Sequence, residues 1–349
     1  MSQPVVSAGQ KSLNTPVPVR FVHNGRPGAL EAAEANDFEG LLAARPEILR
    51  AFAENGDLCW TVQTFCRLRE AGYGNIELAT EPAHGRINLS KAKTLSRRGW
   101  MPGLFDVSIQ ADYPHVAWAR FHIQQNRDLL GHHAAFVPLW PQPALKPRDP
   151  SRDSVRRVGF IGKVDGNLAG SAELWRNLLA AEGLEFVAPD PGDWHDLSTL
   201  DIIVALRGFD RRRHSAKPAN KLVNAWRAGI PFIGGNDSAY AQAGRPGTDY
   251  LQAITPDEVL GQIARLRADP ALYRSLVEHG RKSARAFSTD AIVSEWVSLL
   301  EGPVAQRYTS WEQHPRVERL SGRSLALAQA SLDRAKALVR LLLRREFEA

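Results

Sequence analysis

The chain contains only two cysteines in 349 residues, too few for a disulfide framework. Cys59 and Cys66 are seven positions apart on one predicted helix (59–71), about two turns from each other and too far apart for a bond. We therefore expect reduced thiols and a cytoplasmic location. No run of about 18 uncharged apolar residues occurs, so no membrane-spanning helix is expected. The start, 1–16, lacks the apolar segment of a secretory signal and is expected to be a flexible arm.

Several functional motifs are also missing. There is no H-E-x-x-H, D-x-D or paired C-x-x-C pattern, so neither a metal site nor a cofactor is expected. The formal net charge of +6 suits nucleic acid, an anionic membrane surface or phosphorylated ligands. No zinc-finger, RNP or recognition-helix signature is present, which disfavours nucleic acid. Gly159, Gly162 and Gly166 do not form G-x-G-x-x-G, which weakens a dinucleotide oxidoreductase; Asp190, just past a strand, keeps that alternative open.

Strand-like and helix-like segments alternate in two series, which predicts an α/β fold of two Rossmann-like domains. We expect the first domain over 17–142, a linker rich in proline and charge over 143–154, the second domain over 155–302 and a helical tail over 303–349. In the first domain, 105–112 is expected to be a strand and 115–126 a helix.

The most informative segment is KPANKLVNAWRAGIPFIGGNDSAY, which begins at Lys217. It predicts a loop, a helix ended by Gly229, a short buried strand and a polar turn. Lys217 and Lys221 flank the start of the helix. Cations beside the free N–H groups of a helix start form a good site for a phosphate or diphosphate.

Residues 155–300 resemble the donor-binding domain of GT-B glycosyltransferases, a family that includes bacterial, nucleotide-sugar-dependent enzymes. The similarity rests on VGFIGKVDGN (158–167), DIIVALRG (201–208), KPANKLVNAWRAGIP (217–231) and the helical pattern of 255–296. The resemblance implies two Rossmann-like domains facing across a cleft, with the C-terminal helix packing back on the first. It also implies a nucleotide-sugar donor in the second domain. Many retaining members carry two glutamates seven residues apart here, but this chain has Ala216 and Asn224 instead. The retaining mechanism therefore cannot be carried over, although the amide of Asn224 can still bond a ribose hydroxyl.

In this family the charge of the leaving phosphate is generally neutralised by Arg and Lys side chains and a helix N-terminus rather than by a bound metal ion. Arg207, at the end of a strand, matches that need together with Lys217 and Lys221, although all three also fit ordinary surface charges. The glycine-rich turn at Gly162 and Lys163 can approach a phosphate or sugar closely. The polar turn after the next strand is expected near the donor, or is an ordinary β-turn; it comprises Gly235, Asn236, Asp237 and Ser238.

In the first domain, Asp112 and His115 lie just past a predicted strand, where the acceptor would bind. Either side chain can act as the general base, and Asp112 can equally be a helix N-cap. Gly25, Arg26 and His84 are loop candidates for contacts to the acceptor.

The basic, leucine-rich helix predicted over 322–347 fits three situations: a peripheral contact with the inner membrane face, packing on the first domain, or a homodimer contact. The function hypothesis is transfer of a sugar from a nucleotide-activated donor to a glycan, glycolipid or other hydroxyl acceptor, in surface polysaccharide assembly. The alternatives are a nucleotide-sugar epimerase of the same fold and a non-catalytic nucleotide- or sugar-binding module.

Overall fold

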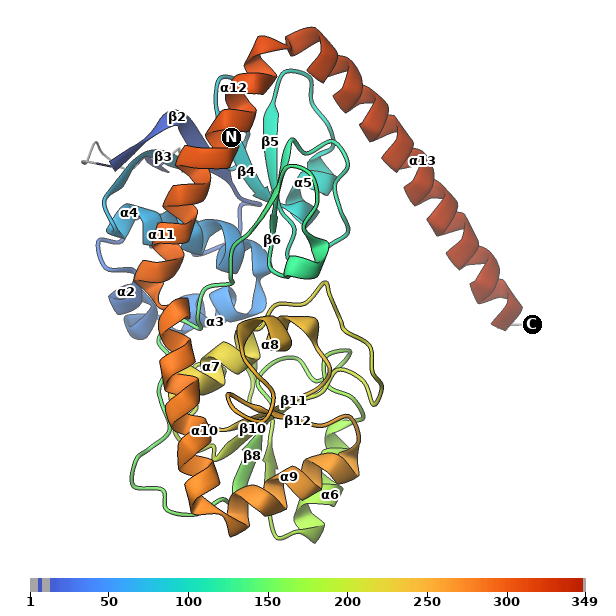
Figure 1. Ribbon diagram of the computed structural model, residues 1–349. Coiled ribbons are helices and arrows are strands. Elements are labelled where there is room, and N and C mark those ends of the chain that lie inside the picture. Colours follow the sequence, from blue (N-terminus) through green and yellow to red (C-terminus); the bar gives the residue numbers. More distant parts are fainter. Residues whose placement is uncertain (1–5, 8–12, 348–349) are drawn as a thin grey trace.

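The computed structural model describes residues 6–7 and 13–347 and consists of two α/β domains stacked one above the other (Figure 1). Residues 1–5 and 8–12 of the expected arm lie outside the described residues, while Leu13 already begins a strand. No helix of the described part combines the length and the apolar character needed to cross a membrane.

The first domain is built on a seven-stranded sheet in the order β1-β3-β2-β4-β5-β6-β7. Only β1 is antiparallel to its neighbour. The strands are β1 Val6–Ser7, β2 Leu13–Val22, β3 Tyr73–Ala79, β4 Ile87–Lys91, β5 Phe105–Ile109, β6 Phe121–Gln124 and β7 Ala134–Phe136. The helices are α1 Ala29–Glu34, α2 Phe38–Ala44, α3 Pro46–Glu54, a π-helical turn Leu58–Val62 that continues into α4 Gln63–Glu70, and α5 Ala92–Arg98.

One prediction for this domain is wrong, and two of its elements were not predicted. Residues 115–126 are not a helix, because Phe121–Gln124 forms the fully buried strand β6. The strand is only four residues long, and its two polar residues, His122 and Gln124, are as buried as Phe121 and Ile123, so a segment this short does not separate strand from helix. The strand β4 and the helix α5 were not expected at all.

The second domain has a five-stranded parallel sheet in the order β12-β11-β10-β8-β9. Its strands are β8 Arg157–Gly159, β9 Glu185–Val187, β10 Ile202–Ala205, β11 Phe232–Gly234 and β12 Leu251–Gln252. Its helices are α6 Ala172–Ala181, α7 Asn220–Ala228, α8 Ser238–Ala243, α9 Pro256–Ala268 and α10 Pro270–Ser283. Gly229 ends α7 in the left-handed conformation, with φ 69°, as the sequence predicts.

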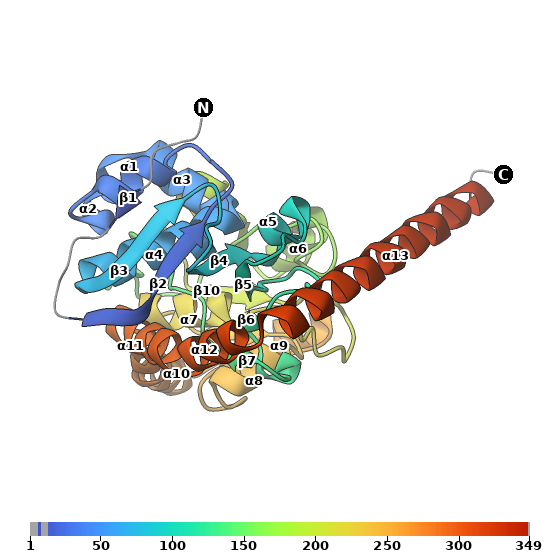
Figure 2. The same ribbon diagram turned by 90° about the horizontal axis from the view of Figure 1, so that it is seen from above.

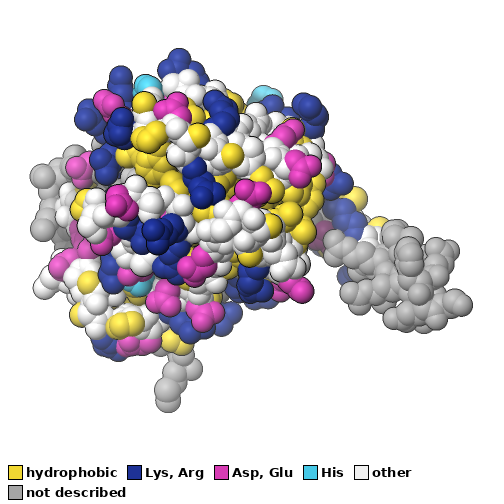
Figure 3. Space-filling view, turned by 90° about the horizontal axis from the view of Figure 1, so that it is seen from below, with side chains coloured by type: hydrophobic (Ala, Val, Ile, Leu, Met, Phe, Trp, Pro, Cys, Tyr) yellow, Lys and Arg dark blue, Asp and Glu magenta, His cyan; other side chains and the backbone are white. Residues whose placement is uncertain are grey.

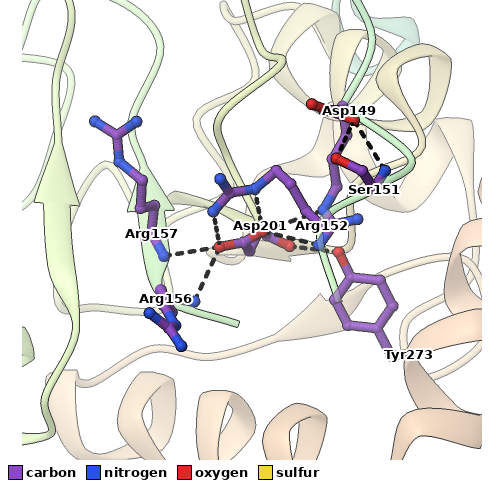
Figure 4. A network of polar contacts seen from close by, with 8 residues as sticks. Asp149, Ser151, Arg152, Arg156, Arg157, Asp201 and Tyr273 are labelled. Carbon is purple, nitrogen blue, oxygen red and sulfur yellow. Dashed lines mark hydrogen bonds and ion pairs between the residues drawn. The ribbon is translucent and has the colours of Figure 1, made fainter. Parts of the chain in front are cut away.

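The linker is fixed to the second sheet by a buried carboxylate. Asp201, directly before β10, is fully buried and accepts hydrogen bonds from the guanidinium groups of Arg148 and Arg152 (Figure 4). The backbone N–H groups of Arg156 and Arg157 complete its coordination at 2.9 Å each. A buried charge with this many donors is well satisfied, so the chain enters the second domain in a defined position.

The chain returns to the first domain near its C-terminal end, as the GT-B resemblance implies, although the helices that pack there precede the one predicted over 322–347. α11 Thr289–Leu299, a second π-helical turn Leu300–Val304 and α12 Ala305–Gln313 pack on the first core. In α12, Tyr308 and Trp311 both pack edge-on against Phe105 of β5, with centroid distances of 5.1 and 5.5 Å. The last helix, α13 Pro315–Phe347, then runs away from the body (Figures 1 and 2).

Candidate functional site

A cavity of about 300 Å³ lies between the domains, at the carboxyl ends of both sheets. In parallel sheets this edge is where ligands bind. The first domain contributes α3, the π-helical turn, Asp112 and the start of the linker, and the second contributes the loop after β8 and the first turn of α7. Side chains that line the cavity include Phe52, Asp112, Trp140, Lys163, Trp194, Lys221 and Asn224.

Lys221 belongs to a group of three cations in the second domain, with Arg207 and Lys217. We call these three residues the cation group. Lys221 Nζ is 5.2 Å from the centroid of the Phe160 ring, and its stem lies beneath Gly162. Burial lowers the pKa of Lys221 to about 7, the nearby charges of Arg207 and Lys217 add to this effect, and Asp237 opposes it. A lysine in such a position regains its charge when an anion arrives.

Arg207 and Asp237 form a buried ion pair beside Lys221. Arg207 Nε is 2.6 Å from Asp237 Oδ1, and the two side chains are 6% and 1% exposed. Burial raises the pKa of Asp237, and Arg207 opposes this rise. Asp237 Oδ2 is buried and accepts no hydrogen bond within the part of the chain that the structure describes. Asp237 Oδ2 therefore remains a buried hydrogen-bond acceptor at the carboxyl ends of β10 and β11.

Asp112 of the first domain meets this cation group across the cleft. Lys217 Nζ is 3.2 Å from Asp112 Oδ2. Burial acts to raise the pKa of Asp112, but the charge and hydrogen bond of Lys217 outweigh it and hold the pKa below its usual range. The carboxylate is therefore ionised and neutralised by the second domain.

Other residues predicted to contact the nucleotide-sugar donor make contacts within the protein. Asn224 accepts a hydrogen bond from Gln142 N at 3.0 Å, so its oxygen is held by the linker while its NH₂ group can donate to a ligand. Asn236 is engaged with the backbone of Arg211 and with Gln252. Ser238 accepts a hydrogen bond from Asn126 of the first domain at 2.8 Å. Gly235 packs against the backbone of Leu206 and Arg207.

Four first-domain candidates do not line the cavity. The ring of His115 stacks on His122 with a centroid distance of 3.9 Å, and burial lowers its pKa. His84 lies at the opposite edge of the sheet, where its Nδ1 is 2.9 Å from the carbonyl oxygen of Gly103. The turn with Gly25 and Arg26 follows the carboxyl end of β2 but does not reach the cavity wall.

Asn126, which was not predicted as a site residue from the sequence, joins the domains. Its Nδ2 donates to Ser238 Oγ and to the carbonyl oxygen of Lys217, and its Oδ1 accepts from Gln242. Nearby, Arg213 forms an ion pair with Asp128 at 2.9 Å. Asn126 was assigned to a helix in the sequence, so no signal placed it at the cleft. The aromatic walls Phe52 and Trp140 were likewise not identified.

Neither a family model nor a curated protein sequence matches this chain. Solved structures do match its architecture. The Anabaena protein HepE, in complex with UDP and glucose, superimposes with a TM-score of 0.51 at 9% identity, over 82% of this chain and 100% of HepE. The chain has the GT-B fold.

Other GT-B structures are similar at lower scores. Sucrose-phosphate synthase from Thermosynechococcus elongatus gives a TM-score of 0.46 at 14% identity, over 76% of this chain and 79% of that one. TarM of S. aureus gives 0.46 at 8% identity over 62% of this chain. This chain spans about half of the length of TarM (55%).

Within the described ranges, no group of three or more His, Cys, Asp or Glu side chains is arranged to hold a metal ion. On the face seen in Figure 3, Lys and Arg side chains are scattered among Asp and Glu and do not form one continuous basic surface. The concentrated positive charge of the GT-B cleft is instead the group of Arg207, Lys217 and Lys221.

The position of Lys221 gives a first test. Gly162 has φ +139°, and a Cβ added to it would lie 3.2 Å from Lys221 Cε. We expect Gly162→Ala to cost about 1–3 kcal/mol of unfolding free energy and to weaken nucleotide binding, because Lys221 must move. Gly166→Ala is the matched control, since Gly166 also has a positive φ, +71°, but has no atom within 4 Å of an added Cβ. Denaturant titration and calorimetry measure both effects; equal nucleotide affinity in the two variants would contradict the assigned role of Lys221.

Proposed function

We propose that the protein is a glycosyltransferase that moves a sugar from a nucleotide-activated donor to a hydroxyl acceptor. One observation carries this proposal: Lys221 of the second domain and Asp112 of the first line the same cavity, with Lys217 paired to Asp112 and the charge of Arg207 close to Lys221. The GT-B match to HepE, which was solved with UDP and glucose, supports the same class of ligand.

The donor diphosphate would bind to Lys217, Lys221 and Arg207. These charges, together with the free N–H groups at the start of α7, stabilise the charge that develops on the leaving phosphate, without a metal ion. Aromatic side chains of the wall, Trp194 among them, offer a surface for the base or sugar. The NH₂ group of Asn224 can donate to a ribose hydroxyl.

Asp112 would act as the general base on the acceptor hydroxyl. In the free protein its charge is neutralised by Lys217. A diphosphate competes for Lys217, so donor binding releases the carboxylate for the acceptor. The proposal therefore includes an order of events, with the donor binding before the acceptor.

The acceptor that we propose is a glycan or lipid-linked hydroxyl of surface polysaccharide assembly, in the cytoplasm at the inner membrane face. A panel of nucleotide sugars tests the class of reaction. Release of nucleoside diphosphate in the presence of an acceptor supports transfer. Inversion of the sugar without release indicates an epimerase, and binding without turnover indicates a non-catalytic module.

Asp112→Asn tests the base. We expect kcat to fall by about 10²–10⁴-fold, while donor affinity stays the same or rises because Lys217 loses its partner. His115→Asn is the control, since its ring stacks outside the cavity wall. Full activity of Asp112→Asn together with an inactive His115→Asn would transfer the role of base to His115.

A further inference from the structure

Exposed apolar side chains gather on α13. Eight large hydrophobic side chains are exposed in the described part of the protein, and five of them belong to this helix. They are Val317, Leu320, Leu325, Leu327 and Leu332, between 41% and 69% exposed. At 100° per residue they fall within one sector of roughly 160° of the helix surface. We call this sector the apolar stripe. Large apolar side chains gathered on one side of an exposed helix mark a contact site.

The face of α13 next to the stripe is held by the first domain. Glu318 forms ion pairs with Arg120 at 2.9 Å and with Arg307 at 2.6 Å. One turn further on, Gly322 packs directly on Arg120 and Trp100, with no room for a Cβ. These contacts leave the five apolar side chains of the stripe exposed, Leu325 beside the contact face least so.

The last contact of α13 with the first domain is made by Gln329, which binds the loop that follows Asp112. Gln329 accepts a hydrogen bond from Ala117 N at 2.7 Å and donates one to the carbonyl oxygen of His115 at 3.1 Å. From residue 330 to 336 every described side chain is exposed, and the helix extends away from both domains (Figures 1 and 2). Gln329 is therefore the point where the free part of the helix meets the candidate active-site loop.

The charges along the stripe indicate what covers it. Arg316, Arg323 and Arg334 lie along one border, and none has an ion-pair partner within the described residues. Ser324 and Ser331 fall at the middle of the stripe, where the seam of a coiled coil requires apolar residues. A second copy of α13 would bury these serines and bring arginines together. A lipid surface accepts the leucines and leaves the arginines at the phosphate level.

We propose that an anionic lipid bilayer binds the apolar stripe, and that this contact holds the loop after Asp112 in place through Gln329. The part about Asp112 rests on the proposed function, whereas lipid binding does not. A helix segment without tertiary contacts is marginally stable in water. Lipid contact stabilises that segment and so keeps Gln329 on its two backbone partners. Gln329 acts here as a positioning residue.

Vesicle co-sedimentation of the full chain tests the first part. The wild type should bind vesicles of phosphatidylcholine mixed with phosphatidylglycerol, and bind pure phosphatidylcholine weakly. Leu320→Gln/Leu327→Gln/Leu332→Gln should lose more than about tenfold in affinity, since Gln keeps helix propensity but removes the apolar side chains. Ala330→Gln, exposed and outside the stripe, should bind like the wild type.

Arg316→Gln/Arg323→Gln/Arg334→Gln should bind anionic vesicles about 100-fold more weakly, at about 1 kcal/mol per arginine. Failure of the wild type to bind, or full binding by the leucine triple variant, would overturn the proposal. So would a wild-type dimer that the leucine substitutions dissociate, because a second copy would then cover the stripe.

Hydrogen exchange tests the second part, without any nucleotide or turnover. Anionic vesicles should slow exchange in 113–119 of the wild type. Gln329→Ala should still bind vesicles but show no vesicle-dependent protection of this loop. Binding of the wild type to vesicles with unchanged exchange in 113–119 would overturn the coupling. Because neither measurement uses a donor, failure of the proposed transferase reaction would not affect them.

Discussion

Arg207→Met is expected to lower the free energy of unfolding by about 3–5 kcal/mol and to weaken donor binding by about 10–100-fold. The stability loss arises because Asp237, 1% exposed, is left without its partner. Asp237 already has a raised pKa through burial, and removal of Arg207 raises it further. The folded state then binds a proton that the unfolded state releases, so the stability loss should grow as the pH rises above the normal carboxylate range.

The double variant Arg207→Met/Asp237→Asn separates the two effects. It removes the unpaired charge and should recover most of the stability, but not the donor affinity. Arg212→Met is the control, because Arg212 forms an exposed ion pair with Asp210, and such pairs contribute little. Chemical denaturation and calorimetry with a nucleotide sugar give both quantities. If the double variant regains donor affinity as well, Arg207 has only a structural role.

Lys221 should make donor binding depend on pH. In the free protein its pKa is about 7, and a bound diphosphate raises it. Binding above pH 7 therefore takes up a proton. The affinity should be roughly tenfold weaker at pH 8 than at pH 6. A nucleotide sugar such as UDP-glucose is the right probe, since its diphosphate is esterified at both ends, unlike a terminal phosphate, whose second pKa is near 6.

Calorimetry in buffers of different ionisation enthalpy measures this proton uptake. Lys221→Met should bind weakly at every pH and take up no proton. Lys163→Met is the control, because Lys163 is an exposed cation on the rim of the same cavity. Proton uptake that persists in Lys221→Met would show that another group titrates.

The second domain could be predicted from sequence because its signals are local. Gly229, Pro231 and the glycine pair after β11 mark the ends of elements by their own backbone preferences. The cations of the site follow directly from those boundaries. The first domain was harder, because β6 has only four residues and is buried on both faces although two of them, His122 and Gln124, are polar.

The contacts across the cleft could not be predicted at all. Lys217 and Asp112 are 105 residues apart in sequence, and Asn126 and Ser238 are 112 residues apart. In the sequence, Lys217, Asp112 and Ser238 could be recognised only as polar residues near a turn, and Asn126 only as the end of a predicted helix. Their pairing depends on how the two domains meet, which local propensities do not encode. The same holds for Asn224, whose oxygen is used by the backbone of the linker rather than left free.

The chain passes between the domains twice, at the linker and again between α10 and α11, and both passages lie on the same side of the molecule (Figure 1). They are neighbours, since Leu139 and Phe287 line one small interdomain cavity. Two covalent connections restrict relative motion to one easy rotation, about the line that joins them, and resist twisting and sliding. Closure over a substrate thus brings the same atoms together each time. It also costs less orientational entropy than the closure of two domains joined by a single flexible linker.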